Sequence, residues 1–277
     1  MRITNKHYPE NLQNIFDPPK ALYLSGKLNK DADYISIVGS RTPSSYGYRM
    51  AYVIANKLAR LGVSIVSGLA FGIDAVAHKA CMDAGMPTVA VLASSVDYVT
   101  PRSNQRLANQ IVEKGGVLLS EYQNYDSAHK YRFLQRNRII SGLSRATIVI
   151  EAAEKSGALI TADHAFEQNR EVYVLLGDLD RPLSAGCYKQ IKATKAQPIL
   201  GIDHLMQELK LVEEPEPIKH DEKYLLDLIG KREKSFDQIM RESNLELSVL
   251  NSLIMNLEIK GVLIRTINGF KVKSKSQ

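Results

Sequence analysis

The fold of this chain is decided by residues 34–81, which read YISIVGSRTPSSYGYRMAYVIANKLARLGVSIVSGLAFGIDAVAHKAC. Two copies of one pattern occur here, each with an apolar strand, a glycine-containing turn and a helix. The strands are predicted at 35–38 and 63–66, and the turns at 39–41 and 67–72. Short, continuous apolar runs are typical of parallel strands that are buried on both faces. The stretch therefore predicts an α/β fold in which two glycine turns meet at the carboxyl edge of one sheet.

The two helices have recognisable start signals. Pro43 and Ser44 open the first helix, whose apolar residues recur at helical spacing, and Asp74 is predicted to cap a second helix that extends to Ala84. Helix N-termini carry free N–H groups and a partial positive charge, and glycine lets a ligand approach the backbone. With the forked guanidinium of Arg41, the pattern indicates a phosphate ligand. The alternative is that the glycines only make tight turns.

Further apolar runs extend the sheet along the chain. Strands are predicted at 88–92, 117–119, 146–150, 172–176 and 198–200. Helices are predicted at 104–114, 160–169, 187–192 and 203–210, and residues 177–185 are predicted to form an irregular loop. Ser156-Gly157 and Thr161 precede or open one of these helices, where capping and binding of a further anion are both open.

The most concentrated basic stretch is HKYRFLQRNRIISGL, residues 129–143. Its cations and the aromatics between them are Lys130, Arg132, Arg136, Arg138, Tyr131 and Phe133. Cations that hold phosphates and aromatic rings that stack on bases suit single-stranded nucleic acid. A solvated basic face with inward aromatics is the alternative. Arg102, which follows the third strand, is expected near the same sheet edge as Arg41.

Composition permits several classes of partner and excludes others. The chain has 277 residues, with 36 basic and 30 acidic side chains and a formal net charge of +6, which permits nucleic acid without requiring it. No apolar run approaches the roughly 20 residues of a membrane helix, and the N-terminus lacks a signal-peptide core, so we expect no membrane contact and a cytoplasmic location. Cys81 and Cys187 form no CxxC pair, and the histidines lack HxxxH spacing, so we expect neither a metal nor a cofactor.

The C-terminal region is predicted to be a separate small domain. Residues 211–220, LVEEPEPIKH, have two prolines and no apolar periodicity, which is typical of a linker. Residues 221–277 then predict three helices and a hairpin with an Asn268-Gly269 turn, the arrangement of a winged helix. The expected recognition helix, which starts at 245–248, is poor in base-reading side chains, so protein docking remains an alternative to DNA binding.

Over nearly its whole length the chain resembles the DNA-processing protein A family (DprA, also called Smf). The resemblance rests on motifs in a fixed order: Tyr8-Pro9, Asp17-Pro18-Pro19, Gly26, Val38-Gly39-Ser40-Arg41, Ser45-Tyr46-Gly47, Ser67-Gly68-Leu69-Ala70, Gly72-Ile73-Asp74, Ala77-His78, Leu119-Ser120-Glu121-Tyr122, Phe133, Arg136-Asn137-Arg138-Ile139-Ile140, Glu151-Ala152, Ser156-Gly157-Ala158-Leu159-Ile160-Thr161-Ala162 and Gly186-Cys187. It implies an extended Rossmann-like, mostly parallel sheet with helices on both faces at 1–210, including a lead-in segment at 1–33. The winged helix would follow at 221–277.

The resemblance also implies a function. Family members bind single-stranded DNA without sequence preference, protect incoming DNA during natural transformation, and load the RecA recombinase. Lys130 and Phe133 match the family's lysine and stacking aromatic. The candidate DNA contacts are Gly39, Ser40, Arg41, Ser67, Gly68, Gly72, Arg102, Lys130, Phe133, Arg136 and Arg138. A homodimer is implied as well, although residues 177–196, a region used for family dimerisation and RecA contact, depart from the family pattern.

Enzymatic alternatives have weaker signals, and we expect no catalytic residue. Asp74 and His78 lie one helical turn apart, but no GxSxG elbow occurs, and such a pair is more often structural. A nucleoside-monophosphate phosphoribohydrolase of the lysine-decarboxylase-like group would need a Pro-Gly-Gly-x-Gly-Thr loop and a following glutamate, where this chain has Ser156-Gly157-Ala158-Leu159-Ile160-Thr161. A nucleotide-sensing regulator that acts through the winged helix is the third alternative.

Overall fold

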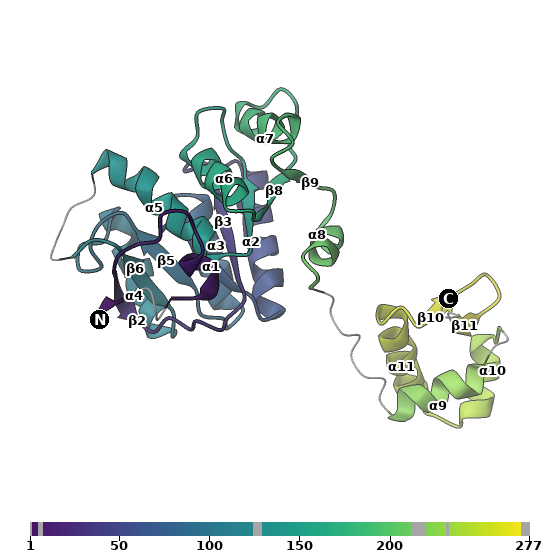
Figure 1. The fold of residues 1–277 in the computed structure, drawn as a ribbon. Coiled ribbons are helices and arrows are strands. Elements are labelled where there is room, and N and C mark those ends of the chain that lie inside the picture. The colour runs from purple at the N-terminus through teal and green to yellow at the C-terminus, as the bar shows by residue number, and fades with distance from the viewer. Residues whose placement is uncertain (1, 5–7, 124–128, 212–219, 231–232, 273–277) are drawn as a thin grey trace. The chain divides into compact units, whose positions relative to one another are not determined.

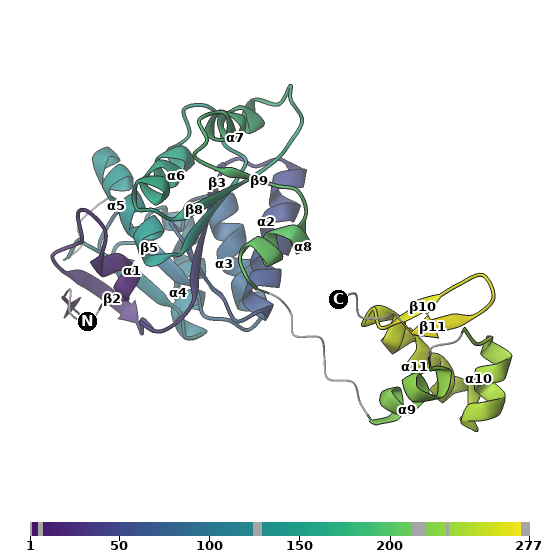
Figure 2. The same cartoon turned by 45° about the vertical axis from the view of Figure 1, so that its right-hand side comes forward.

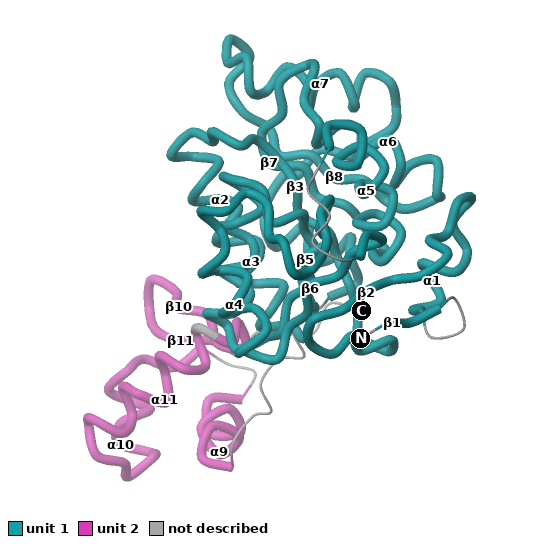
Figure 3. Tube along the Cα trace, turned by 90° about the vertical axis from the view of Figure 1, so that its left-hand side faces the viewer, with its two compact units in different colours: residues 1–211 teal, residues 212–277 magenta. Residues whose placement is uncertain are grey.

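The computed structural model describes residues 2–4, 8–123, 129–211, 220–230 and 233–272 (Figure 1). The chain divides into two compact units, residues 1–211 and 212–277, which are coloured separately in Figure 3. Most of the predicted linker, residues 212–219, lies outside the described residues. The last residues of the predicted winged helix, 273–277, do so too.

A mostly parallel sheet forms the centre of the first unit. In the described part of the chain it has nine strands in the order β1-β2-β6-β5-β4-β3-β7-β8-β9. Their bounds are β1 (Arg2–Ile3), β2 (Leu22–Gly26), β3 (Tyr34–Gly39), β4 (Ser64–Ser67), β5 (Val89–Leu92), β6 (Val117–Ser120), β7 (Ala146–Ile150), β8 (Glu171–Leu175) and β9 (Gln197–Ile199). All neighbours from β6 to β9 pair in parallel, whereas β2 is antiparallel to β6 and β1 to β2. The predicted α/β class is confirmed.

Helices cover both faces of this sheet, as predicted (Figures 1 and 2). Their bounds are α1 (Glu10–Gln13), α2 (Ser45–Arg60), α3 (Ile73–Asp83), η2 (Arg102–Asn104), α4 (Gln105–Glu113), α5 (Lys130–Leu143), α6 (Gly157–Glu167), α7 (Pro182–Lys192) and α8 (Ile202–Glu208). One apolar core lies between the sheet and α1, α5, α6 and α7. A second lies between the opposite face and α2, α3 and α8, and α4 closes a smaller cluster beside it. In the described residues no helix combines the length and apolarity needed to cross a bilayer.

Two local predictions in this unit are wrong. Asp74 is not the N-cap of α3, because Gly72, with φ of 72°, takes that position and Asp74 lies inside the first turn. Residues 182–185 are not loop, because α7 already begins at Pro182. Proline suits the first helical position, where its missing N–H would have no intrahelical partner, so Pro182 is a helix start signal and not a loop residue.

The second unit contains a three-helix core and a hairpin, which agrees with the predicted winged helix. Its elements are α9 (His220–Ile229), α10 (Phe236–Ser243), α11 (Leu247–Ile259), β10 (Leu263–Arg265) and β11 (Phe270–Val272). Ser235 and Gln238 form a capping box at the start of α10, and Phe270 lies in the apolar core with Leu250 and Ile254. Arg265 pairs with Phe270, so Asn268-Gly269 lies in a four-residue connection rather than forming a two-residue turn alone.

Candidate nucleic-acid interface

The order of the strands creates a crevice beside β3. From β3 the chain continues through β4 and β5 to β6 on one side, and then returns to place β7 and β8 on the other side. β3 and β7 are parallel neighbours, and Gly39 lies opposite Ile150 at their carboxyl ends. The loops that follow these strands run apart, and open α/β sheets bind ligands at such a switch point.

A cavity of about 280 Å³ lies at this point. Four parts of the chain line it: the end of β3 and its loop, the start of α3, the middle of α5, and the N-terminus of α6. The lining residues are Val38, Gly39, Arg41, Ala70, Asp74, Phe133, Leu134, Arg136, Asn137, Ile140, Ser156, Gly157, Ala158 and Thr161. The cavity therefore joins residues that are more than 100 positions apart in sequence.

Arg41 and Phe133 form the most distinctive pair in the cavity. The guanidinium carbon of Arg41 lies 5.6 Å from the centre of the Phe133 ring, and the Arg41 side chain is exposed. Ser40 holds the turn that presents it: its N–H donates to Ile150 O at 3.3 Å, its carbonyl accepts from Ile73 N at 3.1 Å, and its hydroxyl accepts from Thr42 N at 3.1 Å. Ser40 thus fixes the backbone that carries Arg41, and the Arg41 guanidinium lies beside an aromatic face.

The N-terminus of α6 provides a second anion-binding feature. The Ser156 hydroxyl caps it by accepting from Ala158 N at 3.3 Å, and Asn137 on α5 donates to the carbonyl of Gly157 at 3.2 Å. Gly157 is exposed, and a side chain at this position would project into open space. The N–H groups of Ala158 and Leu159 donate to Ser156, but the space beside Gly157 is open, so an anion there would meet the positive end of the α6 dipole without a steric obstacle.

The N-terminus of α2, in contrast, already has an anionic partner. The carboxylate of Glu151, which follows β7, accepts hydrogen bonds from Ser44 N at 2.8 Å and from the Ser44 hydroxyl. It also fills the space beside Gly47, where a Cβ would overlap it. Of the N–H groups at the start of this helix that we expected to be free, that of Ser44 is taken by Glu151 and that of Gly47 by the Ser44 hydroxyl, at 3.1 Å.

The second glycine turn has mainly a structural role. Ser67 is fully buried and donates its hydroxyl hydrogen to Ile37 O at 2.6 Å. Gly68 donates its N–H to Asp74 at 3.1 Å, and a Cβ there would overlap the guanidinium of Arg136. A Cβ on Gly72 would overlap Ser40 O, so this glycine lets the turn pack on the backbone of the first turn. None of these three lines the cavity.

Arg136 is buried and bonded to the protein interior. It is 4% exposed, and its Nη1 donates to Gly68 O at 2.7 Å and to Val91 O. Burial lowers the pKa of Arg136 to about 10, which still leaves it charged at neutral pH, and the carboxylate of Asp74 favours that charge. Burial raises the pKa of Asp74, and Arg136 and two backbone N–H groups oppose this by favouring the carboxylate. Arg136 thus fastens α5 to β5 and to the loop after β4.

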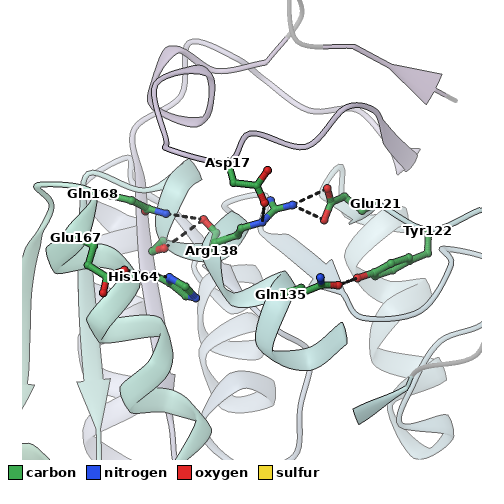
Figure 4. Close-up of polar contacts among 9 residues, drawn as sticks. Asp17, Glu121, Tyr122, Gln135, Arg138, His164, Glu167 and Gln168 are labelled. Atoms are coloured by element: carbon green, nitrogen blue, oxygen red, sulfur yellow. Dashed lines mark hydrogen bonds and ion pairs between the residues drawn. The ribbon is translucent and has the colours of Figure 1, made fainter. Parts of the chain in front are cut away.

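Arg138 points away from the cavity. Its Nη2 donates to both carboxylate oxygens of Glu121, at 2.7 and 2.8 Å, and its Nε lies 3.1 Å from Asp17 (Figure 4). Residues two apart on a helix project about 200° apart, so Arg136 and Arg138 cannot face the same ligand. Arg138 instead joins α5 to the end of β6 and to the lead-in segment.

Lys130 and Arg102 are not among the residues that line the cavity. Lys130 is exposed in the first turn of α5, where the helix dipole disfavours a cation, so its charge does not serve helix stability. The guanidinium of Arg102 stacks on the Tyr98 ring at 4.1 Å. Two residues further, Asn104 donates to Leu69 O at 2.9 Å, which places this stack beside the second glycine turn.

Asp74 and His78 do not form an acid–base pair. Asp74 accepts from Gly68 N and Ala70 N, whereas His78 Nδ1 lies 2.8 Å from the Thr88 hydroxyl. Thr88 gives its own proton to Ile65 O, so His78 carries its proton on Nδ1. Burial lowers the pKa of His78 to about 3, so the ring is neutral at physiological pH. Within the described ranges no cluster of three His, Cys, Asp or Glu side chains could hold a metal ion.

Comparison with known proteins identifies the family. The model of the "DNA recombination-mediator protein A" family matches residues 1–210, and that of the "DprA winged helix domain" matches 210–266. The DNA processing protein DprA of Bacillus subtilis is 40% identical over 209 residues, which cover 75% of this chain and 70% of that protein. The chain belongs to the DprA family.

Further DprA and Smf proteins support the assignment. Protein Smf of Escherichia coli is 43% identical over 189 residues, or 68% of this chain and 50% of that one. The solved structure of DprA from Streptococcus pneumoniae superposes with a TM-score of 0.69 at 34% identity, over 75% of this chain and 74% of that one. DprA from Helicobacter pylori, whose structure was described for its single-stranded DNA binding mode, has a TM-score of 0.68 at 30% identity, over 76% and 96%.

In this DprA-family chain only some of the predicted DNA contacts line the cavity. Gly39, Arg41, Phe133 and Arg136 line one cavity, although Arg136 is buried in internal bonds. The other predicted contacts lie outside the lining: Ser40, Ser67, Gly68, Gly72, Arg102, Lys130 and Arg138. Asn137, which the candidate DNA contacts do not include, lines the cavity as well, together with Ser156 and Gly157, for which the sequence leaves capping and anion binding both open. The sequence signal for this part of the cavity was Ser156-Gly157 ahead of a predicted helix, whereas the pairing of β7 with β3, which brings that helix to Arg41, has no local signal.

The DprA-type winged helix provides little for DNA binding on its third helix. α11, LSVLNSLIMNLEI, has no lysine or arginine. Arg265 on the following strand pairs with Glu258 at 3.0 Å. A recognition helix needs cations for phosphates and polar side chains for base edges, so α11 lacks the charge for docking in a major groove.

Proposed function

We propose that this chain binds single-stranded DNA without sequence preference, at the cavity between the ends of β3 and β7. The observation that carries the proposal is the Arg41–Phe133 pair beside the open N-terminus of α6. The guanidinium and the positive end of the α6 dipole would attract phosphate, and the ring would stack on a base. The single-stranded DNA binding described for the Helicobacter pylori relative supports this proposal.

A polymer suits the site better than a free nucleotide. The surface continues from the cavity along α5, where Tyr131 is 54% and Leu134 45% exposed, so a longer ligand would have further contacts. Of the described residues that line the cavity, only Asp74 carries a carboxylate, and its hydrogen bonds to two N–H groups and its burial beside Arg136 hold it in place. A hydrolase would need a free acid or base at the ligand. We therefore propose binding without catalysis.

The proposal predicts a strong dependence of binding on salt. The measurement is fluorescence anisotropy of labelled oligo(dT) and of a mixed-sequence strand with the full chain at four salt concentrations. Both strands should bind with similar affinity, and log Kd should rise linearly with log salt, by about 0.7 for each phosphate contacted. A duplex of the same length should bind more weakly, because its bases are not free to stack on Phe133.

The same preparation tests the phosphoribohydrolase alternative. Incubation with adenosine monophosphate should release no free adenine, measured by chromatography. Adenine release together with absent oligonucleotide binding would contradict the proposed function and support the enzyme.

Gly157 offers a sharp test of the α6 N-terminus. Gly157→Glu places a negative charge at the start of the helix, where it stabilises the helix by up to about 1 kcal/mol, while it repels a bound phosphate. We expect roughly tenfold or weaker binding of oligo(dT) without loss of thermal stability. The control is Gly157→Gln, which has nearly the same shape without the charge. Equal loss in both variants would show that shape, rather than charge, matters at this position.

The further roles of the family are also proposals for this chain. We propose that it loads RecA onto the bound strand, works as a homodimer, and acts in the cytoplasm during DNA uptake or recombination. The match to a recombination-mediator family supports the RecA role. The departures from the family pattern at 177–196 lie partly in α7, which makes this helix the first place to examine for dimer and RecA contacts.

A further inference from the structure

Phe71 is an exposed aromatic residue at the edge of the cavity. It lies between Ala70, which lines the cavity, and Gly72, which packs against the backbone of Ser40 and Arg41. Its side chain is 49% exposed. The ring is therefore within one residue of the cavity wall and of the Arg41 backbone.

The loop that carries Phe71 is held firmly from both sides. Asp74 accepts from Gly68 N at 3.1 Å and from Ala70 N at 3.3 Å. From the other side, Asn104 donates to Leu69 O at 2.9 Å and to Ala70 O at 3.3 Å. Leu69 beneath it is fully buried. These bonds fix the backbone of the loop, so the exposure of Phe71 is a feature of an ordered loop.

Packing in the apolar core does not explain why an aromatic side chain occupies position 71. Phe71 is missing from the apolar clusters that the described residues form around the sheet. A single exposed apolar residue is common on protein surfaces and by itself needs no explanation. The loop of Phe71, however, contacts the segments that carry two pairs of arginine and aromatic side chains, Arg41 with Phe133 and Arg102 with Tyr98. Asn104, two residues after Arg102, bonds directly to the Phe71 loop.

We propose that Phe71 is a second base-stacking residue, and that the DNA strand leaves the cavity over it toward the Tyr98–Arg102 stack. Proteins that bind single-stranded nucleic acid without sequence preference commonly use cations for the phosphates and aromatic rings for the bases, because every base has a face that can stack. Phe133 lies on α5 and Phe71 follows β4. A DNA strand that passes from Phe133 over Phe71 to Tyr98 would therefore cross the carboxyl ends of β3, β4 and β5 in turn. This inference rests on the proposed function and adds the direction of the strand.

The chain contains no tryptophan, which allows a direct test. In Phe71→Trp the new indole is the sole tryptophan, and a base that stacks on it should quench its fluorescence. Titration with oligo(dT) should give a quench that saturates at the Kd measured by anisotropy. The matched control is Phe166→Trp on α6, where the ring is 44% exposed and lies beside Lys195, away from the cavity lining. We expect no quench there. Tight binding without quench at position 71 would overturn the inference.

Affinity provides a second, independent readout. Phe71→Ala should weaken oligo(dT) binding about tenfold, and Phe71→Leu, which keeps apolar area without a π-face, by nearly as much. The slope of log Kd against log salt should stay the same, because no phosphate contact is lost. For a DNA strand made of abasic sites, Phe71→Ala and wild type should bind with equal affinity, because no base is present to stack on the ring. Unchanged affinity of Phe71→Ala for oligo(dT) overturns this inference and leaves the proposed function intact, whereas a wild-type chain that binds no single strand overturns both.

Discussion

Arg41→Glu should lower the affinity for single-stranded DNA about 100-fold, or by ~2.7 kcal/mol. The change removes a charge-assisted contact to phosphate, worth roughly 1.5–3 kcal/mol, and adds a charge that repels the strand. It also removes the cation that lies 5.6 Å from the centre of the Phe133 ring in the wild-type chain. Anisotropy titration with oligo(dT) at fixed salt measures the effect. Because Arg41 is exposed, the variant should unfold at the wild-type temperature.

The matched control for this prediction is Arg49→Glu. Arg49 is exposed on α2, close to Arg41 in sequence, and the substitution changes the net charge by the same amount. A loss specific to Arg41 would show a direct contact. Comparable losses in the two variants would mean that the general positive field of the chain attracts DNA and that the cavity is not the binding site.

Arg136→Met should destabilise the first unit by about 3–5 kcal/mol, because it removes a buried cation that donates to two carbonyls and favours the nearby Asp74 carboxylate. The variant leaves the carbonyls of Gly68 and Val91 without their donor and leaves Asp74 buried beside no cation. For a unit of this size we expect the midpoint of thermal unfolding to fall by roughly 6–20 °C. Circular dichroism during a temperature scan is the measurement.

Two further variants separate the structural role of Arg136 from DNA binding. Arg136→Met combined with Asp74→Asn removes both buried charges, so it should be less destabilised than Arg136→Met alone. Arg106→Met, at an exposed position on α4, should change stability by less than about 0.5 kcal/mol. If Arg136→Met were as stable as wild type and yet failed to bind DNA, Arg136 would be a direct DNA contact.

Charge and motif alone do not distinguish the cations of the basic stretch 129–143 from one another. The pattern marks Arg136 and Arg138 as equivalent cations, and the structure gives them different internal partners. Their neighbours come from β5, from the loop after β6, and from the lead-in segment, which are distant in sequence. No local pattern states which carboxylate or carbonyl will meet a given guanidinium, because that depends on how the helix is rotated against the sheet.

The amino-acid sequence by itself determined the local elements and the family. Continuous apolar runs, Ser44 and the glycine turns were enough to predict the parallel strands and the helix after the first strand, since strand burial and helix capping depend on near neighbours. Only the tertiary structure decided which loops share the binding cavity. The return of β7 to the side of β3 brings Ser156 and Gly157 to Arg41, while Glu151 occupies the N-terminus of α2. Strand order and buried charge pairing arise from contacts between distant segments, so the spacing of residues along the chain does not reveal them.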